Sequence, residues 1–133
     1  MNTRLNELRS FLAGEMRKDV SDIAGIDPEV IDLCNALNNI VGVRTYESCC
    51  GHGKAPFRVW FRVKSLKPLP KIAYWCDPCR SSAGMWQLVA TTDCSMAPIR
   101  FRLESKDVGE LAYMQAGDMA REIRAMLGNA QQP

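Results

Sequence analysis

Phe57-Arg58-Val59-Trp60-Phe61-Arg62-Val63-Lys64 is the stretch of sequence that decides the fold, because every second residue in it is a large apolar one and the residues between are Arg, Trp, Arg and Lys. Such alternation predicts a β-strand with one face in the core and the other face polar. Ile99 to Leu103 repeats the pattern, with Arg100 and Arg102 in the polar positions. Half-buried strands of this kind are typical of an antiparallel sheet that carries its helices on one face.

Three segments have the pattern of amphipathic helices. Apolar residues recur at three- and four-residue spacing from Asn6 to Lys18, and again from Val108 to Met126, where Gly128 is expected to end the helix. Between them, Asp27-Pro28-Glu29 combines an N-cap acceptor, a proline at the first helical position and an acidic first turn. This signal predicts a helix that stops before Gly42.

Two further strands complete the expected sheet, at Val43 to Glu47 and Trp86 to Thr92. Leu66 to Trp75 contains two prolines and is at best a short helix. The sequence therefore predicts an α+β fold, a four-stranded and mainly antiparallel sheet with helices on one face, in the order α-α-β-β-α-β-β-α. We expect a single domain over residues 1–133, with a tail at 129–133.

Composition excludes few classes of function. Seventeen Lys and Arg against fifteen Asp and Glu give a net charge of +2, which by itself indicates neither a nucleic-acid nor a membrane partner. The first twenty residues are too charged for an export signal, and no apolar stretch is long enough to span a bilayer. We therefore expect a cytoplasmic protein whose six cysteines are reduced and serve metal binding, thiol chemistry or plain burial.

The run Ser48-Cys49-Cys50-Gly51-His52-Gly53-Lys54 is the predicted functional loop. A Cys-x-x-His pair can reach one zinc ion from a tight turn, as can a Cys-x-x-Cys pair further along the chain. Together they predict a small zinc-binding module with a binding or regulatory role. The candidate ligands are Cys49, Cys50, His52, Cys76 and Cys79, with Cys94 as an alternative, and the sequence leaves open which of the two adjacent cysteines points into the site.

The same loop also fits a thiol-dependent enzyme. Cys49 or Cys50 would be the nucleophile, His52 its base, and the N–H groups of Gly51 and Gly53 would bind an anion. A third possibility is a glycine-rich turn with two inert thiols. Whether the protein is an enzyme is left open by the sequence.

A basic strand face provides an alternative that needs no metal. If the two alternating strands are neighbours, their polar faces form a basic surface with an aromatic ring, which suits single-stranded nucleic acid. It equally fits a solvated face whose tryptophan packs on arginine stems, or a surface for a host protein. The residues concerned are Arg58, Trp60, Arg62, Lys64, Arg100 and Arg102.

Arg44 to Val63 resembles a group of small uncharacterised bacterial and phage proteins that share a Glu-Ser-Cys-Cys-Gly-His-Gly signature before a strand with Pro-Phe and Trp-Phe. The signature stands here at Glu47 to Gly53. Thr92 to Pro98 is similar to the same group, which implies that Cys94 lies near the loop, while plain burial of Cys94 fits the sequence equally well. The resemblance covers about half of the chain and implies no activity.

Trp75-Cys76-Asp77-Pro78-Cys79 is similar to the Trp-Cys-x-Pro-Cys active site of thioredoxin-like oxidoreductases, and Pro98 to their downstream proline. The chain between Cys79 and Pro98 is too short for the long helix and the βα unit of that fold. The pair therefore favours a metal site or a surface loop, with a reversible dithiol as the remaining alternative.

Overall fold

The computed structural model describes residues 19–91 and 100–130. The predicted helix from Asn6 to Lys18, together with Cys94 and Pro98, lies outside these residues. The described part follows the order α-β-β-α-β-β-α. Its elements are α2 (Pro28–Asn38), β1 (Val43–Cys49), β2 (Pro56–Val63), α3 (Leu69–Cys76), β3 (Trp86–Thr91), β4 (Arg100–Val108) and α4 (Gly109–Ala130).

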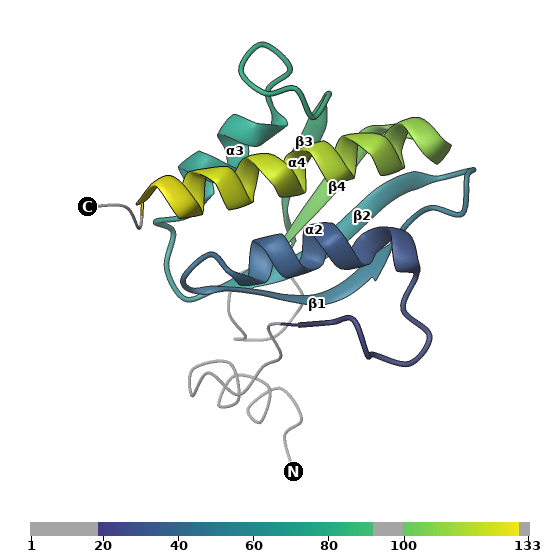
Figure 1. Ribbon diagram of the computed structural model, residues 1–133, viewed down its shortest axis with the longest axis horizontal. Coiled ribbons are helices and arrows are strands. Elements are labelled where there is room, and N and C mark those ends of the chain that lie inside the picture. The colour runs from purple at the N-terminus through teal and green to yellow at the C-terminus, as the bar shows by residue number, and fades with distance from the viewer. Residues whose placement is uncertain (1–18, 92–99, 131–133) are drawn as a thin grey trace.

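The four strands form one antiparallel sheet in the order β1-β2-β4-β3. Helices α2 and α4 lie across one face of this sheet and contact each other (Figure 1). The predicted α+β class and the placement of the helices are therefore confirmed. None of the described helices is long and apolar enough to cross a membrane.

The core lies between the sheet and the helices. The apolar positions of the decisive strand, Phe57, Val59 and Phe61, are fully buried. Phe61 stacks on Phe101 of the neighbouring β4, with their ring centroids 5.7 Å apart. The helices contribute Leu33, Leu37, Ile72, Met119 and Ile123 to the same core. Burial of this alternating face is what fixes the register of the sheet, because a slip of one residue would turn these rings outward.

Strand β1 is two residues longer than predicted and contains a β-bulge. Its pairing with β2 shifts between Thr45 and Glu47, so that Ser48 lies opposite Val59 and Cys49 opposite Arg58. An inserted residue reverses which positions face the core beyond it. The connection between β1 and β2 is therefore only the segment 50–55, and Ser48 and Cys49 belong to the strand rather than to the loop.

Helix α4 continues to Ala130, so the prediction that Gly128 ends it is wrong. A glycine ends a helix by adopting a positive φ, and Gly128 is not among the described residues with positive φ. Residues 129 and 130 of the predicted tail are helical, and residues 131–133 lie outside the described part.

Glu122 of α4 holds the turn that follows α3. Its carboxylate accepts hydrogen bonds from the Ser81 hydroxyl at 2.6 Å and from the Ser82 hydroxyl and N–H at 2.9 and 3.0 Å. Partial burial raises the pKa of Glu122, but the three hydrogen bonds outweigh it and the net shift is downward. The ionised carboxylate therefore stabilises the fold above the unfolded-state pKa of about 4.3, and this contribution is lost as the pH falls through the lower folded-state pKa.

We therefore expect Glu122→Gln to destabilise the protein at pH 7 and to cost much less at about pH 3, where the wild-type carboxyl is largely protonated in the unfolded chain. The comparison is made from urea unfolding curves of both proteins at the two pH values. Equal losses at both pH values would show that the charge of Glu122 does not matter.

Candidate functional site

The loop after β1 is held in a strained, compact conformation. Gly51, His52 and Gly53 have consecutive positive φ angles of 84°, 52° and 79°, and His52 is the one residue other than glycine with a positive φ in the described chain. The carbonyl of Gly51 accepts hydrogen bonds from the N–H groups of Lys54 and Ala55, at 3.1 and 3.0 Å. A side chain in this backbone region is uncommon and often marks a functional position.

Asp27 reaches this loop from the start of α2. Its position before Pro28 predicts an N-cap acceptor, and although it occupies the N-cap, its side chain makes no capping hydrogen bond. Its Oδ2 instead accepts a hydrogen bond from the N–H of Cys50 at 3.0 Å and lies 3.9 Å from Nε2 of His52. The carboxylate is thereby tied to the loop rather than to its own helix.

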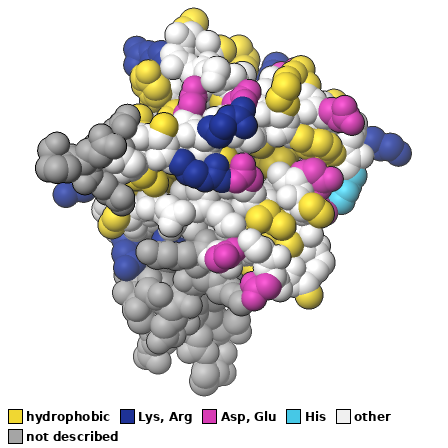
Figure 2. All heavy atoms as spheres, in the orientation of Figure 1, with side chains coloured by type: hydrophobic (Ala, Val, Ile, Leu, Met, Phe, Trp, Pro, Cys, Tyr) yellow, Lys and Arg dark blue, Asp and Glu magenta, His cyan; other side chains and the backbone are white. Residues whose placement is uncertain are grey.

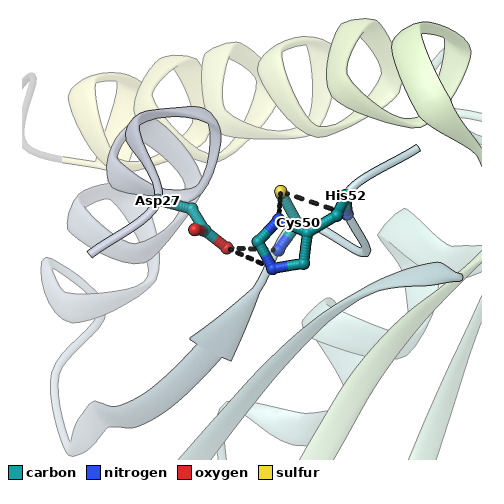
Figure 3. Close-up of side chains that lie close together, drawn as sticks. All are labelled: Asp27, Cys50 and His52. Carbon is teal, nitrogen blue, oxygen red and sulfur yellow. Dashed lines mark hydrogen bonds and ion pairs between the residues drawn. The ribbon is translucent and has the colours of Figure 1, made fainter. Parts of the chain in front are cut away.

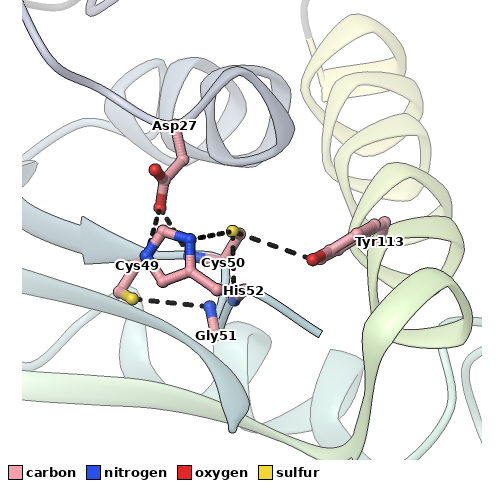
Figure 4. A network of polar contacts seen from close by, with 6 residues as sticks. All are labelled: Asp27, Cys49, Cys50, Gly51, His52 and Tyr113. Atoms are coloured by element: carbon pink, nitrogen blue, oxygen red, sulfur yellow. Dashed lines mark hydrogen bonds and ion pairs between the residues drawn. The ribbon is translucent and has the colours of Figure 1, made fainter. Parts of the chain in front are cut away.

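Cys50 is the thiol that points into the site (Figure 3). Its Sγ lies 3.7 Å from Nδ1 of His52 and accepts a hydrogen bond from the N–H of His52 at 3.4 Å. The hydroxyl of Tyr113, on α4, donates to the same sulfur at 3.8 Å (Figure 4). Cys50 is 2% exposed, whereas the side chain of His52 is 71% exposed. The chain has a single histidine, and Figure 2 shows its side chain at the surface.

The charges of the group depend on one another. Burial raises the pKa of Cys50, hydrogen bonds from His52 N–H and Tyr113 lower it, and the neighbouring carboxylate of Asp27 raises it again, so the net shift is upward. The hydrogen bond from the N–H of Cys50 is the main cause that keeps the pKa of Asp27 below its usual value. At neutral pH the group thus pairs an ionised carboxylate with a protonated thiol.

Asp27, Cys50 and His52 each offer one ligand atom within 4.8 Å of the others, and no other group of three or more His, Cys, Asp or Glu side chains in residues 19–91 and 100–130 does so. Zinc bonds of about 2.3 Å to sulfur and 2.0 Å to nitrogen, at a tetrahedral angle, place the two ligand atoms about 3.5 Å apart. The distance of 3.7 Å between Cys50 Sγ and His52 Nδ1 is close to that value.

The predicted Cys-x-x-Cys pair does not join the loop. Cys76 is buried in α3, where its Sγ donates to the carbonyl of Ile72 and burial raises its pKa to about 11. Cys79 is an exposed free thiol. Cys49 lies on β1, opposite Arg58 and outside the group of three, and its Sγ accepts a hydrogen bond from the N–H of Gly51 at 3.4 Å. The described residues therefore do not assemble the predicted site of three thiolates and one imidazole.

Asp27 and Tyr113 were missed by sequence analysis. They lie 23 residues before and 63 residues after Cys50, so no local spacing connects them with the loop. In the sequence Asp27 indicates only the start of a helix, because an aspartate directly before a proline is common at that position and suggests no further role. Neither residue could have been assigned to the site before the packing of α2 and α4 was known.

A cavity of about 390 Å³ adjoins the group of three. One wall is the segment before α2 and the other is β1, from Thr45 to Cys49. Cys34 of α2, which is 1% exposed, also lines the cavity. The lining residues are Val20, Ile23, Ala24, Gly25, Ile26, Asp27, Cys34, Thr45, Tyr46, Glu47, Ser48, Cys49 and His52.

The basic residues of β2 and β4 do share one face, because the two strands are neighbours. Trp60 pairs with Arg102, and Arg62 with Arg100. Their charges have partners on the protein itself: Arg58 and Arg102 each lie 3.5 Å from Oε1 of Glu104. Arg62 and Arg100 lie over the ring of Tyr46, at 4.2 and 5.1 Å from its centroid, and Arg62 is 4% exposed. Lys64, beyond the end of β2, is exposed. These contacts favour the structural interpretation of the basic face.

Comparisons with models of protein families, with curated proteins and with solved structures gave no match. The function is therefore inferred from the chemistry of the group of three and from the residues that line the adjoining cavity.

Proposed function

We propose that the protein is a small metal-binding module that holds one Zn²⁺ ion with Asp27 Oδ2, Cys50 Sγ and an imidazole nitrogen of His52. The observation that supports this is the convergence of a carboxylate, a thiol and an imidazole from two separate segments within 4.8 Å. These three groups are the protein ligands that zinc prefers. The hydrogen bonds that Cys50 Sγ accepts from the His52 N–H and the Tyr113 hydroxyl would stabilise a metal-bound thiolate.

Three protein ligands leave one position of a tetrahedral ion for water or for a bound molecule. The cavity includes Asp27 and His52 in its lining, so such a position is within reach of whatever the cavity holds. A site of this kind suits a binding or regulatory role in which the ion completes a pocket.

Thiol-dependent catalysis is the second candidate, favoured by one feature of the geometry. The imidazole of His52 lies between Cys50 and Asp27, with Nδ1 on the side of the sulfur and Nε2 on the side of the carboxylate. A base placed between a nucleophile and an orienting carboxylate is the general arrangement of an activated thiol. The nucleophile would have to become accessible, since Cys50 is buried.

Metal analysis of protein purified without added metal separates the two candidates. For zinc binding we expect about one zinc per chain, which falls to near zero in Asp27→Asn, Cys50→Ser and His52→Ala. Cys49→Ser is the matched control, because it removes the neighbouring thiol from outside the group, and it should keep its zinc. Protein that holds no zinc as purified and takes up none from solution would overturn the proposal. Rapid alkylation of Cys50 in that metal-free protein would then support the thiol enzyme.

A further inference from the structure

We propose that the outer edge of β1, between Thr45 and Cys50, binds a short extended peptide that carries a basic side chain and adds to the sheet as a fifth strand. The proposal concerns the cavity beside the group of three and does not require the ion. An exposed strand edge is a template for an added strand, and many peptide-binding domains use it in this way.

β1 is an edge strand, paired only with β2 among the described residues. Two N–H groups that turn away from β2, one in β1 and one directly after it, are held by side chains from the two ends of α2. Thr45 N–H donates to Oδ1 of Asn38 at 2.7 Å, and Cys50 N–H donates to Oδ2 of Asp27 at 3.0 Å. Helix α2 therefore closes the edge of β1 at both ends.

Ser48 lies in the stretch of edge between these two closures. Backbone groups of a strand alternate between its two sides, so the N–H and C=O of Ser48 face the same side as the N–H of Cys50. The bulge between Thr45 and Glu47 determines which of the following residues turn their backbone groups away from β2. The cavity runs along this stretch, and every residue from Thr45 to Cys49 lines it.

The length of the strand edge that lines the cavity suits a short extended chain. Four residues of β1, from Tyr46 to Cys49, span about 13 Å at the usual rise per residue, which is the length of three or four peptide residues. The opposite wall contributes the apolar side chains of Val20, Ile23 and Ile26, on which side chains of the added strand can pack. The volume of about 390 Å³ lies within the range of pockets that enclose small ligands.

The charge of the lining selects a basic peptide. Asp27 and Glu47 line the cavity, and no Lys or Arg is among the described lining residues. If zinc is bound, the carboxylate of Asp27 and the thiolate of Cys50 neutralise it, and Glu47 still supplies a negative charge. A lysine or arginine side chain of the peptide is therefore favoured in both states of the site.

Selection from a library of acetylated and amidated hexapeptides with randomised positions tests the proposal on the full chain. We expect enrichment of peptides with a lysine or arginine between β-branched or other apolar residues. The selected peptide should bind Ser48→Pro about tenfold more weakly or worse, because proline lacks the N–H that pairs with the added strand. Ser48→Ala keeps that N–H and should bind as the wild type does. Enrichment on the wild type no greater than on Ser48→Pro would overturn the proposal.

N-methylation of the selected peptide, one residue at a time, removes single N–H groups of the peptide and tests whether it pairs as a strand. An added strand pairs through every second residue, so losses of affinity should alternate along the peptide. Losses without a period of two would show that the peptide does not bind as a strand. Glu47→Gln should weaken a lysine-containing peptide by up to about fivefold and leave its uncharged analogue unchanged.

The proposal and the zinc site can fail separately. Cys50→Ser is expected to lose zinc but to bind the selected peptide, because the edge N–H of Ser48 and the charge of Glu47 are untouched. Binding of the peptide by a protein without zinc supports the strand edge alone. Loss of peptide binding in Cys50→Ser that is correctly folded would overturn the claim that the edge works without the ion.

Discussion

Gly51→Ala is expected to lower the free energy of unfolding by roughly 2 to 5 kcal/mol, as the sum of backbone strain and steric overlap. Gly51 has a φ of 84°, which costs about 1 to 2 kcal/mol for any residue with a side chain. A Cβ at this position would lie 1.9 Å from the carbonyl oxygen of Ala55 and 2.9 Å from that of Pro56. Both contacts are with backbone, so rotation of a side chain cannot relieve them.

Gly53→Ala is the matched control, because Gly53 has a similar φ of 79° but no atom within 4 Å of an added Cβ. Its expected cost is the backbone strain alone, about 1 to 2 kcal/mol. Urea unfolding of the two variants and the wild type measures the difference. Because the carbonyl of Gly51 accepts both loop hydrogen bonds, Gly51→Ala should also lower the zinc content, and equal stabilities of the two variants would refute the steric argument.

The alternation of apolar residues predicted the sheet correctly because the core face of β2 is buried along its whole length. The same pattern could not predict the course of β1, where a bulge between Thr45 and Glu47 changes which side chains face the core. Without that extra residue, Ser48 and Cys50 would face the opposite side. A bulge is set by the register with the partner strand, and no residue type in β1 predicts it.

Two of the three members of the candidate site were named from the sequence, and the third was not, for a related reason. The loop has its own local signal, two glycines and a histidine beside two cysteines, so Cys50 and His52 were found from sequence. The third member of the group, Asp27, depends on where the start of α2 lies relative to the end of β1, which is a tertiary contact. The ligands predicted in its place, Cys76 and Cys79, had a ligand-like spacing, but in the fold they belong to α3 and to the turn after it.

Asp27 and Asn38 give α2 a second role beyond its apolar face. They stand at the two ends of the helix, at its N-cap and at its last residue, and their side chains accept the backbone N–H of Cys50, directly after β1, and of Thr45, within β1. The helix thus fixes the edge strand and the entrance to the loop together. A change at either end should therefore affect both the stability of the sheet edge and the geometry of the site.

Asn38→Ala is accordingly expected to lower the free energy of unfolding by roughly 1 to 3 kcal/mol, the usual penalty for leaving one buried polar group, here the N–H of Thr45, without a partner. Asn38 is fully buried; its Oδ1 accepts from the N–H of Thr45 at 2.7 Å and its Nδ2 donates to Oγ1 of Thr45 at 2.9 Å. Alanine would leave the N–H of Thr45 unpaired and would remove one partner of its hydroxyl, which also hydrogen-bonds with the thiol of Cys34, at a residue that is itself 8% exposed. Thermal and urea unfolding measure the loss.

The neighbouring Asn39→Ala removes an exposed amide that donates to the carbonyl of Asn35, and it should change the stability by less than about 0.5 kcal/mol. Since the two variants delete the same chemical group one residue apart, their difference isolates the bond to the strand edge. If Asn38→Ala were no more destabilising than Asn39→Ala, water would have to replace the amide at Thr45. The edge of β1 would then be open to solvent there, and α2 would close it at Cys50 alone.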